Sequence, residues 1–518
     1  MTHTPFQSLT RSVGVVLSAW VLLGPMALAQ PDLNEQYPPL QPTPLIKPAP
    51  SPSLAPPVPE ENAMEPLHPL NKVVPTYLTP EFLVSTTWWD AYGRDDLRAF
   101  VITALLNNLE LRAKEFDLKA QQQALRKQFA QELPTLSLGA SWIKQKNSKN
   151  LISPRASQFS SGGANVFSPG STFNIYNLPL TLNYEVDWLG KNHLQTQALR
   201  LRYEAEALKL RDMELALAEH AVNTAIQSIG TESRLELSRQ RLTVLEEWEH
   251  LQRENYQAGL ESKDNLLLRK QALETLKTSI TALKNDAGVL EHEASYLAGQ
   301  PVNAFVWKDP SLASTEYLRR VDLAPFLAWT SIESDRLLHR PDVAMSELQL
   351  QAAGVDVKVA RRIFLPSFTL SAQAGLASTK LSNWFSWDSL LASVGASLAQ
   401  QLFAGGAIKA NLKQQKAIYE SLGRLYQNQL LLAGRNAENA FIDLKQRLEA
   451  ATLAESQEQI AEEQYVLSQV RYKAGVTSYI LTFSQLDALL QKRLATVTAR
   501  QDALMAWNHL QRELGGGF

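Results

Sequence analysis

The stretch YQAGLES at residues 256–262 is echoed by YKAGVTS at residues 472–478, and this pair decides the architecture. The shared glycine favours a left-handed helix end, because a missing Cβ removes the steric cost of that conformation. No proline occurs from Leu180 to Gln300 or after Pro366, and both stretches are rich in helix-forming residues. We therefore predict two long antiparallel helical hairpins, each turning at one of these glycines.

Other landmarks recur in the same order and indicate that the chain is duplicated. LPTLSL at 133–138 corresponds to LPSFTL at 365–370, and Gly190 corresponds to Gly406. The first copy is longer between these landmarks, so we predict an inserted loop there. The predicted boundaries are 81–300 for the first repeat, 301–340 for a connection and 341–518 for the second repeat.

Four segments near these landmarks alternate between apolar and polar residues, with the period of two that is typical of strands. They lie at 135–142, 178–188, 367–376 and 392–398. Each alternation lasts about ten residues, which is close to what a tilted strand needs to cross a bilayer. Glu185 and Asp187 fall on the polar face of the second segment, and we predict that both face an aqueous lumen.

The period changes to that of a helix after the second strand of each copy. Leu201, Leu208, Leu215, Val222 and Ile229 recur every seven residues, as in a coiled-coil seam. A helix from 190 to 255 would be about 100 Å long at 1.5 Å per residue.

Four membrane-length strands cannot close a barrel, because the smallest spanning barrels have about eight strands and an open edge cannot face lipid. We therefore predict an oligomer: a dimer would supply eight strands and a trimer twelve, and only the larger ring leaves a wide polar lumen. The expected fold class is mainly α with a small β portion. A duplicated helix-strand-strand-helix-helix unit is expected to form long antiparallel coiled-coil helices and to contribute four strands to a transmembrane β-barrel that several copies share.

Composition and the N-terminal region exclude several other classes of protein. Residues 1–29 have the order of a secretory signal peptide, and residues 30–80 form a Pro-rich linker that we expect to be disordered. The net charge of −2 argues against a nucleic-acid partner, and the lack of cysteine excludes disulfides and thiolate metal sites. No catalytic or cofactor motif is present. We predict no enzyme activity, no cofactor and no resident metal.

The second copy resembles the outer membrane efflux protein family, the TolC-like channels, and within it the NodT branch. The resemblance rests on RPDV at 340–343, LPSFTL at 365–370, QLFAGG at 401–406, RYKAGVTSY at 471–479 and GGGF at 515–518. It implies a homotrimer with a trimeric 12-stranded transmembrane β-barrel in the bacterial outer membrane, in contact with lipid, and with a helical tunnel in the periplasm. The expected function is the exit duct of a tripartite efflux pump, which passively conducts small molecules received from a periplasmic adaptor and an inner-membrane transporter.

The resemblance also implies roles for particular residues. Adaptor docking maps to the two hairpin tips, namely Tyr256, Ala258, Gly259, Ser262, Tyr472, Ala474, Gly475, Thr477 and Ser478. The aperture positions of the family correspond here to Leu481 and Ser484, neither of which is acidic. Asp487 is the nearest acid and completes the set of candidate aperture residues.

Two alternative functions remain at this point. The chain could be the outer-membrane duct of a type I protein secretion system, which uses the same architecture with a different transporter. It could also be an exported coiled-coil scaffold of the envelope, with its strands in an ordinary soluble sheet.

Overall fold

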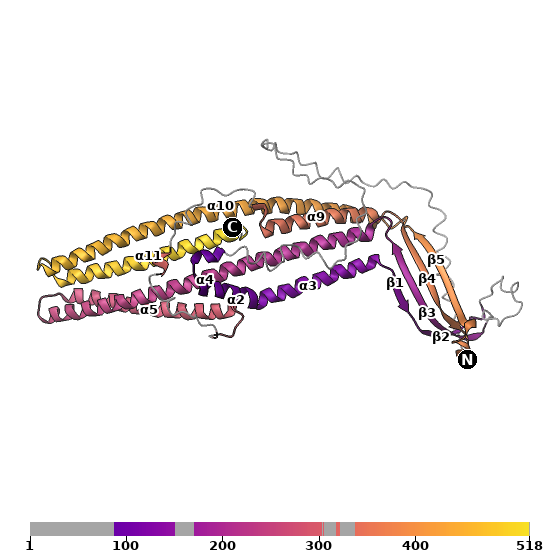
Figure 1. Ribbon diagram of the computed structural model, residues 1–518, viewed down its shortest axis with the longest axis horizontal. Helices are drawn as coiled ribbons and strands as arrows, with labels where there is room; N and C mark the ends of the chain where they lie inside the picture. The colour runs from indigo at the N-terminus through magenta and orange to yellow at the C-terminus, as the bar shows by residue number, and fades with distance from the viewer. Residues whose placement is uncertain (1–87, 151–169, 303, 305–316, 322–336, 517–518) are drawn as a thin grey trace, which may run out of the picture. The chain divides into compact units, whose positions relative to one another are not determined.

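The computed structural model describes residues 88–150, 170–302, 304, 317–321 and 337–516, all within one compact unit, Val73–Phe518. The predicted signal peptide and linker, most of the inserted loop and much of the 301–340 connection lie outside the described residues. The elements, labelled as in Figure 1, are η2 (Trp88–Tyr92), α2 (Asp95–Asn107), α3 (Leu109–Phe129), η3 (Ala130–Glu132), β1 (Thr135–Leu138), β2 (Ser141–Lys146), β3 (Thr172–Val186), α4 (Lys191–Gln257), α5 (Lys263–Leu297), α6 (Tyr317–Arg320), α9 (Pro341–Arg362), β4 (Ser367–Ser378), η5 (Leu381–Asn383), η6 (Trp387–Ser389), β5 (Leu390–Ala399), α10 (Ala407–Lys473) and α11 (Tyr479–Glu513).

The strands form one antiparallel sheet in the order β1, β3, β4, β5, and β2 also pairs with β3. Leu138 lies opposite Leu180 and Ser141 opposite Asn177, so the register runs through the gap without a shift. The first predicted strand is therefore one strand position in two segments. The interruption lies opposite Pro179, which has no N–H to donate to the ladder.

The register sorts the two faces of the sheet by polarity. Leu182 lies between Leu136 and Ala372, and Ala372 lies opposite Val394, so this row of side chains is apolar. The neighbouring row consists of Ser137, Thr181, Gln373 and Ser393 and is polar. The predicted alternation is confirmed. The apolar face is also exposed in the single chain, since Leu136 is 65% exposed and Val394 is 88% exposed.

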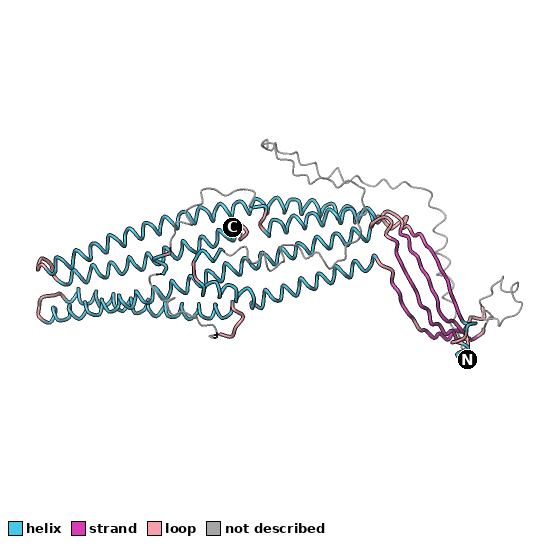
Figure 2. Tube along the Cα trace, viewed as in Figure 1, coloured by secondary structure: helices cyan, strands magenta, loops and turns pink. Residues whose placement is uncertain are grey.

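The long helices are matched in length between the two copies. Helices α4 and α10 have 67 residues each, and α5 and α11 have 35 each. Short loops join α4 to α5 and α10 to α11 (Figure 2). Helices α3 and α9 lead into strands and pack on α4, while α5 and α11 follow the loops and also pack on α4. The predicted hairpins are therefore present, and α10 packs on both α9 and α11.

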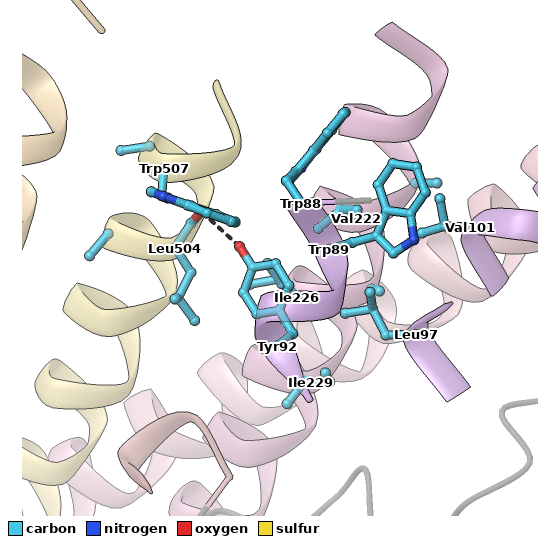
Figure 3. Packing of buried hydrophobic residues seen from close by; sticks show 14 of the residues in the cluster. Trp88, Trp89, Tyr92, Leu97, Val101, Val222, Ile226, Ile229, Leu504 and Trp507 are labelled. Atoms are coloured by element: carbon cyan, nitrogen blue, oxygen red, sulfur yellow. Dashed lines mark hydrogen bonds between the residues drawn. The ribbon is translucent and has the colours of Figure 1, made fainter. Parts of the chain in front are cut away.

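The main core lies where η2, α2, α4 and α11 meet. Leu215, Val222 and Ile229 of the predicted seam are buried there, together with small residues of α4 such as Ala218. Figure 3 shows Trp89, Leu97 and Val101 beside Val222, with Ile226 and Ile229 near Tyr92. Leu201 and Leu208 are only half-buried. The heptad seam is thus confirmed from Leu215 onward.

A buried polar chain crosses this core. The Tyr92 hydroxyl lies 2.7 Å from the Asn508 Oδ1 and 3.2 Å from the Leu504 carbonyl oxygen (Figure 3). The Asn508 amide in turn donates to the Asn223 Oδ1 at 2.9 Å. Asn508 is fully buried, and burial raises the pKa of Tyr92 well above its usual value. The tyrosine therefore stays a neutral donor that joins the start of the first repeat to α11 and α4.

Candidate functional site

The turns of the two hairpins have the same backbone. Gly259 and Gly475 have φ of 74° and 71°. Leu260 N–H donates to the Asn255 carbonyl at 2.8 Å, and Val476 N–H donates to the Arg471 carbonyl at 2.9 Å. These are the six-to-one bonds of a Schellman helix end, which satisfy carbonyls that the helix leaves free. The predicted glycine helix ends are confirmed at both tips.

Apolar side chains project from both turns. Leu260 is 79% exposed and Val476 is 71% exposed, at corresponding positions of the two copies. The tyrosines four residues before them are exposed as well. The following helices begin differently: the Ser262 hydroxyl accepts the Asn265 N–H at 3.2 Å, whereas Ser478 makes no side-chain cap. Of the remaining predicted tip residues, Ala258 and Ala474 are exposed and Thr477 is half-buried.

Close to the tips, aromatic rings connect the two hairpins. Tyr472 packs on Tyr479 at 4.8 Å between ring centroids, and Tyr479 packs on Phe483 at 4.6 Å. Phe483 stacks on Trp248 of α4 at 6.4 Å, and the Arg269 guanidinium of α5 lies 3.1 Å from the centre of the Trp248 ring. Such ring and cation contacts add to apolar burial. No pattern in the sequence indicates this contact between the two hairpins.

The three candidate aperture residues lie on α11 in different surroundings. Leu481 is exposed and Ser484 is half-buried. Asp487 is only 8% exposed, and its carboxylate accepts Arg241 Nε of α4 at 2.5 Å and Gln491 Nε2 at 2.7 Å. The aperture assignment stays a prediction for all three residues. The structure adds that the charge of Asp487 is balanced within the chain.

The two candidate lumen residues lie where β3 passes into α4. Glu185, in β3, accepts Lys191 Nζ at 2.7 Å. Asp187 follows the strand, and its carboxylate accepts the His193 N–H at 2.7 Å in the first turn of α4, where a negative charge is favoured. Both residues line a cavity of about 460 Å³ together with Arg362. Their position in a lumen stays a prediction, and each acid also has a local structural partner.

A clasp of ion pairs joins the start of α9 to the end of α11. Pro341 begins α9, as expected for a helix start, while the Arg340 side chain binds Asp342 at 2.8 Å and Glu513 at 2.6 Å. Burial opposes ionisation of Asp342, but the hydrogen bond and charge of Arg340 outweigh it and lower the pKa of Asp342. The clasp fixes the chain end against α9.

No described helix is both long enough and apolar enough to span a membrane. Within the same part of the chain, no three His, Cys, Asp or Glu side chains gather closely enough to hold a metal ion.

Comparison with known proteins gives consistent matches along most of the chain. A model of the family described as outer membrane efflux protein matches residues 101–287 and 334–516. The toluene efflux pump outer membrane protein TtgF of Pseudomonas putida is 25% identical over 435 residues, covering 83% of this chain and 85% of that protein. The pyoverdine export outer membrane protein OpmQ of Pseudomonas aeruginosa is 26% identical over 443 residues, with coverages of 83% and 87%.

Solved structures share the fold. The Campylobacter jejuni CmeC outer membrane channel has a TM-score of 0.72 at 22% identity, covering 84% of this chain and 88% of that one. The Vibrio cholerae outer membrane protein VceC has a TM-score of 0.68 at 22% identity, with coverages of 84% and 99%. The NodT branch stays a prediction. Because the family model spans both repeats, the chain belongs to the outer membrane efflux protein family.

Proposed function

We propose that three copies of this chain close their sheets into one 12-stranded barrel, which is the outer-membrane exit duct of a tripartite efflux pump. The two-faced sheet carries the proposal. Its apolar rows are exposed in the single chain, and a face of this kind is stable next to lipid. Its polar rows of Ser, Thr, Asn and Gln suit a water-filled lumen.

The edges of the sheet support closure between copies. Within the described chain, β5 pairs only with β4, and β1 and β2 pair only with β3. Unpaired strand edges are not tolerated in lipid, so each edge requires a neighbour. Four strand positions per copy give eight in a dimer and twelve in a trimer, and the larger ring leaves room for solutes.

The helices carry further surfaces that fit neighbouring copies. Helix α10 exposes Ile442, Leu453 and Ile460, and α3 at the other side of α4 exposes Phe116. Exposed apolar residues along a helix of this length are typical of an interface. We propose that these surfaces pair between copies to form the wall of a periplasmic tunnel.

The hairpin tips are the proposed docking site for a periplasmic adaptor, which connects the duct to an inner-membrane transporter. The exposed Leu260 and Val476 support this, because each offers an apolar anchor on a rigid turn. The proposed cargo is small molecules. The curated relatives are named for the export of toluene and pyoverdine, which favours a small-molecule pump over a type I protein secretion duct. Family membership and the matched channel folds argue against an envelope scaffold.

The decisive experiment compares two adjacent substitutions on opposite faces of β5. Val394→Asp places a carboxylate on the apolar face, and Ser393→Asp places one on the polar face. We expect Val394→Asp to abolish threefold particles in electron microscopy of detergent-extracted membranes, because a charge facing lipid is costly. Ser393→Asp should retain threefold tubes with a detergent belt. Equal behaviour of the two variants, or a wild-type protein that leaves the membrane without detergent, would contradict the proposal.

A further inference from the structure

The two tips have the same backbone but opposite charge. From residue 254 to 264 the first tip carries Glu254, Glu261 and Asp264 against a single Lys263. From residue 470 to 480 the second tip carries Arg471 and Lys473 and no acid. A duplicated turn has therefore kept its shape while its charges have diverged.

The charges of the second tip are not neutralised within the chain. Arg471 and Lys473 are exposed, and neither has an ion-pair partner among the described residues. Glu458 and Glu462 lie several helical turns away along α10 and are engaged by Arg493 of α11, at 3.6 and 3.4 Å. The second tip is thus a basic surface around the exposed Val476.

The acids of the first tip are also available to a partner. Glu254 and Asp264 are exposed, and the His250 imidazole lies 3.8 Å from the Glu254 carboxylate. Arg253 does not offset them, because its guanidinium is bound to Glu249 at 2.6 Å. Glu261 is half-buried and accepts Asn265 Nδ2 at 2.5 Å, so it belongs to the turn itself.

We propose that the two tips are distinct docking positions for one periplasmic partner protein, which presents acidic side chains to the second tip and basic side chains to the first. The proposal rests on the proposed docking of an adaptor at the tips and adds the chemistry that sets its register. Leu260 and Val476 give both positions an exposed apolar anchor at corresponding points of the turn, so charge is the main difference between the two exposed surfaces. Charges at the rim of an interface act mainly on specificity and association rate.

The expected preference is moderate and depends on salt. A single exposed ion pair contributes little to binding affinity. Two such pairs together should favour binding to the matched tip by about 2- to 30-fold. Screening at about 1 M salt, where the Debye length is about 3 Å, should remove most of it.

The test uses a photoreactive benzoylphenylalanine in place of Ala258 or Ala474, two exposed residues at corresponding positions of the tips. The full-length channel is produced in its native host, irradiated in cells, and the crosslinked partner peptides are sequenced by mass spectrometry. We expect the probe at 474 to capture an acid-rich segment and the probe at 258 to capture a base-rich segment of the same partner. Capture of one and the same segment at both positions would overturn the proposal.

A charge-exchange variant provides the matched control. Glu254→Lys and Asp264→Lys are combined with Arg471→Glu and Lys473→Glu, which exchanges the charges of the tips and leaves the net charge of the chain unchanged. We expect the captured segments to exchange positions, because the common backbone lets the partner shift from one tip to the other. A second variant carries Gln or Asn at the same four positions, also with unchanged net charge, and should lose the preference. Retention of the wild-type pattern in either variant would refute the role of charge.

The same experiment separates this inference from the proposed docking. If neither probe captures a partner, docking at the tips is wrong, and the charge inference fails with it. If both capture a partner and Leu260→Ser with Val476→Ser abolishes capture, docking holds. The result from the charge-exchange variant alone then decides whether the charge inference is correct.

Discussion

The ion pair between Arg241 and Asp487 should hold the two hairpins of one chain together near their tips. Arg241 lies on α4 and Asp487 on α11, 246 positions apart. The Arg241 side chain is 22% exposed and that of Asp487 is 12% exposed. Arg241→Met keeps the length and apolar stem of the side chain but, among the described residues, leaves the carboxylate with Gln491 as its remaining side-chain hydrogen-bond donor.

The magnitude follows from burial. Removing one partner of a fully buried pair costs about 3–5 kcal/mol. Partial exposure of Arg241 and the bond from Gln491 reduce the expected cost to about 1–3 kcal/mol. Because a factor of ten corresponds to about 1.4 kcal/mol, local opening of α11 should become about 5- to 150-fold more frequent.

Hydrogen exchange of the full-length protein in detergent measures this opening directly. Peptides covering 479–492 should exchange faster in Arg241→Met. Arg239→Met is the matched control, because Arg239 lies two residues away and, among the described residues, its guanidinium forms ion pairs only with Glu232 and Glu236 of its own helix, at 3.9 and 3.8 Å. Equal exchange in the two variants would refute the reasoning. A change of ion selectivity in Asp487→Asn without faster exchange would instead support a pore-facing carboxylate.

Three further predictions concern stability, each read from the melting temperature of the detergent-solubilised protein. Gly516→Ala should lower it more than Gly259→Ala: both residues have φ near 75°, at 75° and 74°, but only at Gly516 would the new Cβ meet a leucine side chain, at 2.3 Å. The hydrogen bond with Glu219 raises the pKa of His509 despite opposing burial, so its stabilisation is complete below about pH 6.5 and is lost as the pH rises through the folded pKa. The wild type should therefore lose more stability than His509→Gln between pH 6 and 8, and an identical pH profile would contradict this. Tyr92→Phe leaves a buried asparagine oxygen without its donor and should cost about 1–3 kcal/mol, while an unchanged melting temperature would show that this bond is weak.

The features that the sequence predicts well are those carried by local periodicity. The alternation of Leu136 and Leu138 with Ser137 predicts one face of a strand, and the pairing register with β3 confirms it. The glycine turns at 259 and 475 could be predicted equally well from the sequence, because a left-handed helix end favours glycine at that position. The interruption opposite Pro179 could also have been inferred, since a proline inside a strand removes a ladder donor.

The features that were missed depend on contacts between distant parts of the chain. No period in the sequence indicates that Arg241 meets Asp487, or that Arg340 reaches Glu513. Asp187 illustrates a different limit: its lumen-facing position stays a prediction, but the alternation did not indicate that β3 ends one residue earlier or that the Asp187 carboxylate binds the start of α4. At the junction of a strand and a helix, a polar residue is compatible with the period of either element, so the sequence pattern does not show to which element it belongs.

The equal lengths of α4 and α10, and of α5 and α11, constrain how this protein can change in size. An added heptad lengthens a helix by about 10 Å. If the heptad is inserted into one copy alone, the hairpin turn of that copy extends beyond the turn of the other copy. The ring contact between Trp248 and Phe483 then loses its register. An insertion or deletion can therefore persist only when it occurs in all four helices together, so a variant designed for a wider periplasm must be extended by the same number of residues at four separate places in the gene.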